Sequence, residues 1–121
     1  MDIISLCKMI EGLTDYKIYP INFPDGVDGI ASKLEIITGM METGGVYDFN
    51  IEISVKAYHP SEAEGICLDL INKLHKVTDV EYGIHQLIIC QAEKSNPFYV
   101  GQLETGEHLF TCNFRLMTCV M

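Results

Sequence analysis

The sequence predicts an α+β fold, a mostly antiparallel sheet of about five to six strands with two helices packed on one face. Three stretches indicate this fold. Residues 47–58 alternate apolar and polar side chains, as a half-buried strand does. Residues 59–76 repeat apolar side chains at helical spacing, and residues 98–120 form two apolar runs around a glycine turn. A length of 121 residues suits one hydrophobic core, so 1–121 is expected to be a single domain.

The first third of the chain predicts short elements separated by turns. Apolar residues at helical spacing, with Gly12 near the end, predict a short helix from Ile3 to Leu13. Residues 16–20 are typical of a brief strand that stops at Pro20, and 21–29 of a loop rich in Pro and Gly. Residues 32–39 favour a second strand, followed by a turn-rich connection over 40–48.

Residues 47–58 form the clearest strand in the sequence. At ~3.4 Å per residue it is about 35 Å long, more than a small domain usually needs. Either part of it pairs with a neighbouring molecule, or it is a long hairpin arm covered within the chain. Its apolar face consists of Tyr47, Phe49, Ile51, Ile53, Val55 and Ala57.

The helix predicted over residues 59–76 begins with a capping-box pattern, Ser61 and Glu64. Acidic residues at its start and basic residues at its end complement the helix dipole. Capping therefore explains these carboxylates, in preference to an acid/base pair. Gly65 indicates a close approach to a strand, since glycine inside a helix costs about 1 kcal/mol relative to alanine.

Residues 83–92 predict a strand that is apolar on both faces, with Leu87 and Ile89 on one side and Ile84, Ile88 and Cys90 on the other. Such a strand must be covered on both sides. The second cover comes either from another subunit or from the chain's own loops.

The last hairpin turns at Gly106, which can adopt the positive φ of a tight turn. Its second strand places Phe110, Cys112, Phe114 and Leu116 in the core. Phe98 and Tyr99 follow Pro97, which forces extended backbone, and they cannot both enter one core. One of them is expected to contact a partner or to anchor a loop.

Composition excludes several classes of protein. With 17 acidic and 8 basic residues, the net charge is −9, and no basic stripe exists to bind nucleic-acid phosphates. The longest apolar runs fall far short of the ~20 residues that span a bilayer, and the first residues do not resemble a secretion signal.

Cysteine and histidine show no recognisable catalytic or metal pattern. The five cysteines form no CxxC and are expected to be reduced core thiols. The alternatives are a zinc site across strands or a Cys/His enzyme, but no complete catalytic motif is present. We therefore expect no enzyme activity and no cofactor. The residues these alternatives would use are His85, Cys90, His108 and Cys112.

The carboxy-terminal pattern carries a family resemblance. It comprises Gln91-Ala92, Pro97-Phe98-Tyr99, Gly101, Glu104, Gly106, Phe110 and Asn113-Phe114. This pattern, with the order of elements along nearly the whole chain, resembles the small bacteriophage minor capsid proteins that act as tail terminators, or tail-completion proteins, in long-tailed phages.

The resemblance implies an assembly role and a tail-terminator-like fold. Proteins of this family form a ring, usually a homohexamer, that caps the tail tube, stops its growth and offers a face to the head connector. DNA passes through the central hole without sequence-specific binding, and an acidic lumen would let it slide. The expected location is the head–tail junction of the virion, after assembly in the host bacterial cytoplasm.

The resemblance also suggests contact residues. The loops Ile21–Ala31 and Met40–Val46 are expected to meet tube and connector. Interface candidates are Phe98, Tyr99, Leu103, Leu87, Ile89, Phe23, Met40 and Met41, and lumen candidates are Glu42, Asp48 and Glu52. Two alternatives remain open: another head–tail connector or completion protein, and a stand-alone α+β domain that binds a small molecule or peptide in a pocket lined by Phe98 and Tyr99.

Overall fold

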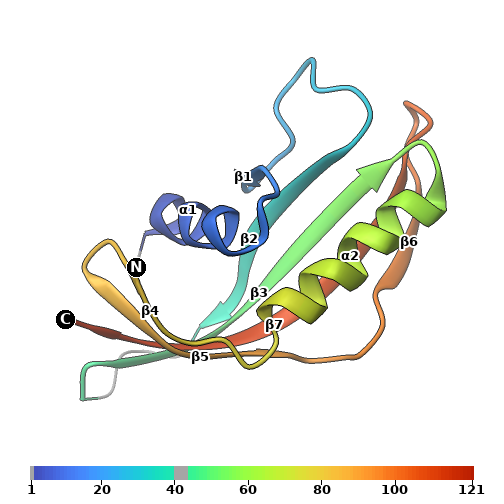
Figure 1. Ribbon diagram of the computed structural model, residues 1–121. Helices are drawn as coiled ribbons and strands as arrows, with labels where there is room; N and C mark the ends of the chain where they lie inside the picture. The colour runs from blue at the N-terminus through green and yellow to red at the C-terminus, as the bar shows by residue number, and fades with distance from the viewer. Residues whose placement is uncertain (1, 40–43) are drawn as a thin grey trace.

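The computed structural model describes residues 2–39 and 44–121. It confirms the predicted α+β class. A curved, seven-stranded sheet carries both helices, α1 (Ile3–Thr14) and α2 (Pro60–Leu74), on one face (Figure 1). No helix among the described residues is long and apolar enough to cross a membrane.

The sheet has more strands than the sequence predicts. Its strand order is β1-β2-β3-β7-β5-β4, with β6 also paired to β7; in the described part of the chain, β1 and β2 are the only parallel pair. The strands are β1 (Ile18–Pro20), β2 (Ala31–Gly39), β3 (Val46–Ala57), β4 (Thr78–Tyr82), β5 (His85–Ala92), β6 (Phe98–Gln102) and β7 (His108–Val120).

β7 is the central strand of the sheet. One of its edges pairs with β3 along its whole length. The other edge is shared, because β6 pairs with residues 108–111 and β5 with residues 114–120. The connection 93–97 leaves the sheet between these two pairings. Along this edge of β7, one strand therefore ends before the other begins (Figure 1).

The core lies between the sheet and the helices. The alternation predicted for β3 is confirmed, since Ile51, Ile53, Val55 and Ala57 are fully buried. The first three of these pair across to the buried residues Phe114, Cys112 and Phe110 of β7. Each buried aliphatic or aromatic side chain contributes about 1.5–3 kcal/mol. The apolar side of α2 completes this core with Ala63, Cys67, Leu70, Ile71 and Leu74.

The two helices begin differently. The carboxylate of Asp2 caps α1, accepting hydrogen bonds from the Ile4 N–H (3.0 Å) and the Ser5 hydroxyl (2.8 Å). The capping box predicted for α2 is wrong, because His59 is the N-cap residue and its side chain makes no capping bond. Pro60 takes the first helical position, where its fixed φ and missing N–H are tolerated. Ser61 therefore lies inside the first turn.

Two features near β5 differ from what the sequence predicts. A short strand, β4, precedes β5 in a stretch for which no strand was predicted. A β-bulge between Leu87 and Ile89 then shifts the alternation of β5, so Leu87 and Cys90 are both buried. The strand therefore has one main core face, and its edges are paired to β4 and β7 inside the chain.

Candidate assembly surfaces

The β6 strand presents apolar side chains at a free sheet edge. Phe98, Tyr99 and Val100 are 68%, 46% and 53% exposed. The Tyr99 ring lies 5.0 Å from the ring of Phe110, and its hydroxyl lies 2.9 Å from Nδ1 of His108. Tyr99 is thus anchored to β7, whereas Phe98 projects into solvent. An exposed edge with apolar side chains is a template for another strand.

A second free edge lies on the opposite side of the sheet, in the second half of β2. Within residues 2–39 and 44–121, β1 pairs with residues 32–34 alone, and the last backbone bond on this side runs from the Ile21 N–H to the Leu34 carbonyl (2.8 Å). Beyond it, Ile36 and Ile37 are 37% and 50% exposed. Ile21 itself has a φ of 68°, which is unfavourable for a β-branched residue. The hydrogen bond to Leu34 holds it there.

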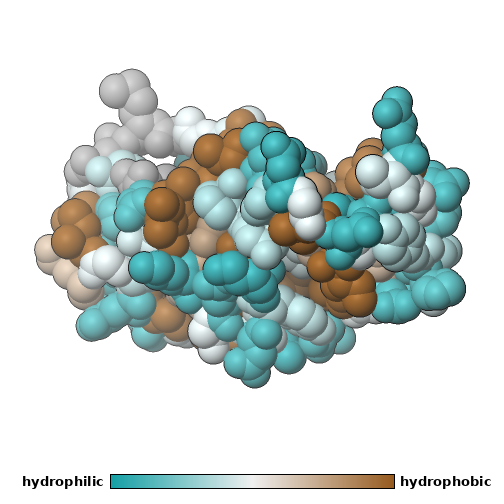
Figure 2. Space-filling view, turned by 90° about the horizontal axis from the view of Figure 1, so that it is seen from above, coloured by the Kyte–Doolittle hydropathy of each residue, from teal (hydrophilic) through white to brown (hydrophobic). Residues whose placement is uncertain are grey.

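The edge of β2 also borders a hollow of about 370 Å³. It is lined by Ile3, Ile21, Glu35 and Ile36. Figure 2 shows hydrophobic residues in several separate patches, set among hydrophilic ones, on the face seen from above. On this face the exposed apolar residues are therefore separate patches and not one continuous apolar surface.

The sheet face turned away from the helices is polar. Asp48 accepts two hydrogen bonds from the Arg115 guanidinium, at 2.9 Å from Nε and 2.5 Å from Nη2. This pairing holds the pKa of the Asp48 carboxyl below its usual range. Glu52 lies between Glu35 on β2 and Asn113 on β7 in the strand register. Of the three lumen candidates, Asp48 is neutralised by Arg115, Glu52 lies on the same face, and Glu42 lies outside the described residues.

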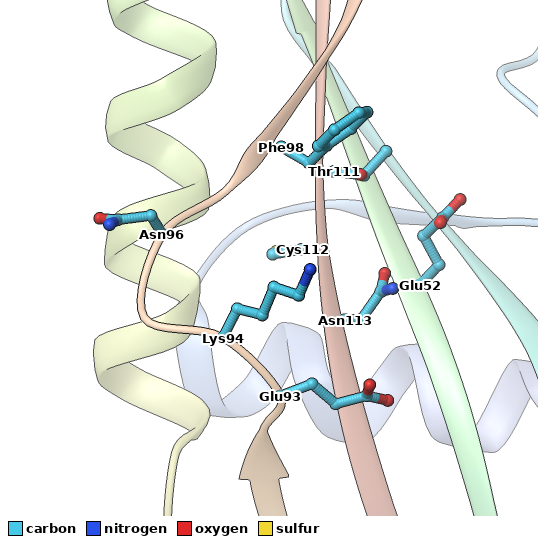
Figure 3. Close-up of a pocket in the computed structure, with 8 residues that line it drawn as sticks. All are labelled: Glu52, Glu93, Lys94, Asn96, Phe98, Thr111, Cys112 and Asn113. Atoms are coloured by element: carbon cyan, nitrogen blue, oxygen red, sulfur yellow. The ribbon is translucent and has the colours of Figure 1, made fainter.

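A pocket of about 170 Å³ opens on this polar face where β5 gives way to β6. Figure 3 shows the Lys94 side chain extending from the connection between these strands toward β7, with Asn113 on β7 and Glu52 on β3. The pocket is small, and charged side chains of both signs line it. Phe98 lines it and Tyr99 does not, so the two aromatics do not form a common apolar pocket.

The remaining interface candidates occupy different environments. Leu87 is fully buried and Ile89 half-buried in β5, so Leu87 is not part of the surface. Leu103 is half-buried, and its N–H donates to the Glu107 carbonyl within the last turn (2.8 Å). Phe23 anchors the loop between β1 and β2, with the ammonium groups of two lysines 5.2 and 5.0 Å from its ring centroid. Met40 and Met41 lie outside the described residues.

A buried ion pair that the sequence did not predict lies beneath this loop. The ammonium of Lys56 donates to the Glu107 carboxylate at 2.8 Å and to the Val27 carbonyl at 2.9 Å. Lys56 is 6% exposed and Glu107 is fully buried. Hydrogen bonds from Lys56 and Thr105 lower the pKa of Glu107 to about 2. The only hint in the sequence was a lysine on the polar side of a strand, and nothing in the sequence pairs it with Glu107.

A second contact ties down the same loop. The Tyr58 hydroxyl donates to the Asp28 carboxylate, which raises the pKa of Tyr58 to about 12. The loop Ile21–Ala31 is therefore fixed to the end of β3 and to the β6–β7 turn, and it presents one defined shape.

The candidate zinc and thiol residues are used in packing. The His85 ring stacks on Tyr82 with centroids 5.4 Å apart, and His108 bonds to Tyr99. Burial raises the pKa of Cys7 to about 11 and that of Cys90 to about 12, which favours the protonated thiol. In residues 2–39 and 44–121, no group of three or more His, Cys, Asp or Glu side chains could hold a metal ion.

The fold has a counterpart among solved structures. A chain of the structure described as "Virion of native gene transfer agent (GTA) particle" superposes with a TM-score of 0.59 at 15% sequence identity. The match covers 91% of this chain and 84% of that chain. No protein-family model matches the sequence, and no curated protein matches it. At this identity the likeness defines a shared fold, an α+β fold also used in a virion.

Proposed function

We propose that this protein is a structural component of a phage-like virion, and specifically a tail terminator at the head–tail junction. The observation that carries this proposal is the fold shared with a chain of a gene transfer agent virion over 91% of the present chain. The pattern from Gln91 to Phe114, which resembles tail terminators, supports the finer assignment.

In this role the chain forms a ring, expected to be a homohexamer, that caps the tail tube and joins it to the head connector. The exposed apolar residues at two unlike sheet edges suit head-to-tail contacts, which close into a ring when the rotation permits. The fixed loop Ile21–Ala31 offers a defined surface to the next ring. The net charge of −9 suits a channel through which DNA passes without being bound. The role is non-enzymatic and requires no cofactor.

The test is to interrupt the coding sequence in a particle-producing genome and image the products by electron microscopy. We expect filled heads without tails, together with free tails of uncontrolled length, and recovery of normal particles when the protein is supplied separately. Normal particles in the interrupted strain would overturn the proposal. Free tails of normal length would overturn the terminator role and favour another head–tail completion protein.

A further inference from the structure

We propose that the joint between neighbouring subunits is an added β-strand, in which β6 of one copy pairs antiparallel with residues Glu35–Gly39 of β2 in the next copy. This inference rests on the proposed function, because it names the interface that would build the ring. The joint does not involve β3 or β5, since both of those strands are paired on both sides inside the chain.

The two segments are unpaired parts of opposite sheet edges. Among the described residues, β6 pairs with β7 alone, and β2 beyond Leu34 pairs with β3 alone. Each segment is five residues long, Phe98–Gln102 on one side and Glu35–Gly39 on the other. Unpaired backbone groups at such edges favour the addition of a strand.

Strand direction is compatible with this joint. β2 is antiparallel to β3, β3 to β7, and β7 to β6. β6 therefore runs opposite to β2, so two copies in the same orientation bring the segments together as an antiparallel pair.

The side chains also match across the joint. Tyr99 pairs with Phe110 and Ile36 with Ile51, and both of those partners face the helix-covered side of the sheet. In a joined sheet Tyr99 and Ile36 therefore lie on the same side, beside the hollow lined by Ile3 and Ile21. Burial of exposed apolar surface at this joint supplies the driving force.

The strand register defines how neighbours are displaced. β6 lies level with Ala31–Lys33 of its own chain, because Phe110 pairs with Val55 and Val55 pairs with Ser32. The free segment is centred at Ile37, about five residues further along, which corresponds to a displacement of ~17 Å per subunit. A ring built this way has its strands inclined to its axis, as in closed β-structures.

The partner at each edge is a second copy of this chain. The β6 edge and residues 35–39 of β2 lie on opposite sides of one molecule and match each other in length, strand direction and apolar side chains. The two edges consist of different residues, so the contact is head-to-tail and repeats from copy to copy.

Lysine substitutions at the two edges test the joint, because charges on edge strands oppose strand addition. The variants are Val100→Lys and Ile37→Lys, both at exposed positions, with Ile84→Lys as the matched control in the β4–β5 turn. Circular dichroism checks that each variant is folded, and light scattering over a concentration series measures mass.

We expect the wild type and Ile84→Lys to reach ring mass, and each edge variant alone to stay monomeric, with association weakened about 100-fold or more. An equimolar mixture of the two edge variants is the decisive sample. Each variant keeps one intact edge, so the mixture should form dimers and stop there.

Edge variants that assemble like the wild type, or a mixture that remains monomeric or grows beyond dimers, would overturn the joint. A wild type that stays monomeric at every concentration would also overturn it. These results leave the proposed function standing, since that proposal is tested separately by the particles of the interrupted strain.

Discussion

Two ion pairs on the same face of the sheet differ in how deeply they are buried. Lys56 and Asp48 both belong to β3, on its polar side, and each pairs with a residue next to or in β7. The Lys56 and Glu107 side chains are 8% and 1% exposed, whereas those of Arg115 and Asp48 are 53% and 22% exposed. The first pair lies beneath a loop and fixes its position. The second lies on an open surface, where water and salt weaken it.

The difference shows how one strand serves two purposes. At one end β3 fixes the loop that would face another ring, and at the other it leaves a polar surface with charges of both signs. Loss of one partner should therefore be severe at the buried pair and mild at the open one.

The largest effect is expected for Glu107→Ala, which leaves the Lys56 ammonium buried without its carboxylate. We expect the thermal midpoint to fall by more than about 10 °C, measured by scanning calorimetry. The double variant Lys56→Met/Glu107→Leu should recover much of the loss, because it removes both charges. A single variant as stable as the wild type would contradict the role assigned to the pair.

The second-largest effect is expected when acid weakens the buried ion pair. The pKa of Glu107 is lowered from 4.5 to about 2 in the folded protein. A lowered pKa in the folded state stabilises the protein above the unfolded value, so this contribution is present above about pH 4.5 and is lost as the pH falls toward 2. Glu107→Gln should flatten the stability profile over this range in urea titrations. An unchanged slope would show that other carboxylates account for it.

A smaller effect is expected for Tyr58→Phe, which removes the hydrogen bond to Asp28 and keeps the ring. The thermal midpoint should fall by less than about 5 °C. Thermolysin should cut the loop 21–30 several times faster, since its tie to β3 is weakened. Tyr19→Phe is a matched control, and equal cleavage rates in the two variants would argue against the tie.

The smallest effect is expected for Asp48→Ala at the open pair. The thermal midpoint should change by less than about 3 °C, and 1 M NaCl should shrink the difference from the wild type. Glu107→Ala should keep its effect in the same salt. A salt-insensitive loss at Asp48 would show that this pair is more enclosed than its exposure indicates.

Local patterns predicted much of the fold. The faultless alternation of residues 47–58 located β3, and the glycine turn located the β6–β7 hairpin. The capping box failed because Pro60 could begin the helix one residue before Ser61. β4 was not predicted because the stretch from Thr78 to Tyr82 is short and mostly polar. It forms a strand because it pairs with β5. The bulge in β5 shifts which side chains face the core, and the apolar–polar periodicity of a sequence does not indicate where a bulge occurs.

The candidate surfaces divide in the same way. The sequence could predict that Phe98 and Tyr99 do not both enter the core, because Pro97 forces extended backbone before two successive aromatic residues. The free edge at Ile36 and Ile37 could not be predicted, since it depends on β1 covering only part of β2. Lys56 and Glu107 are likewise paired by tertiary structure alone, across strands that are distant in sequence.

The position of β7 has a consequence for biosynthesis. It follows the other six strands that the structure describes, yet it joins β3 on one edge and both β5 and β6 on the other. During translation the β2–β3 arm, α2 and the β4–β5 hairpin emerge without the strand that connects them. Non-local pairing of this kind slows folding, so the edges of the proposed joint would be complete only after β7 has been made. Incomplete chains would then be excluded from the proposed ring without any separate checkpoint.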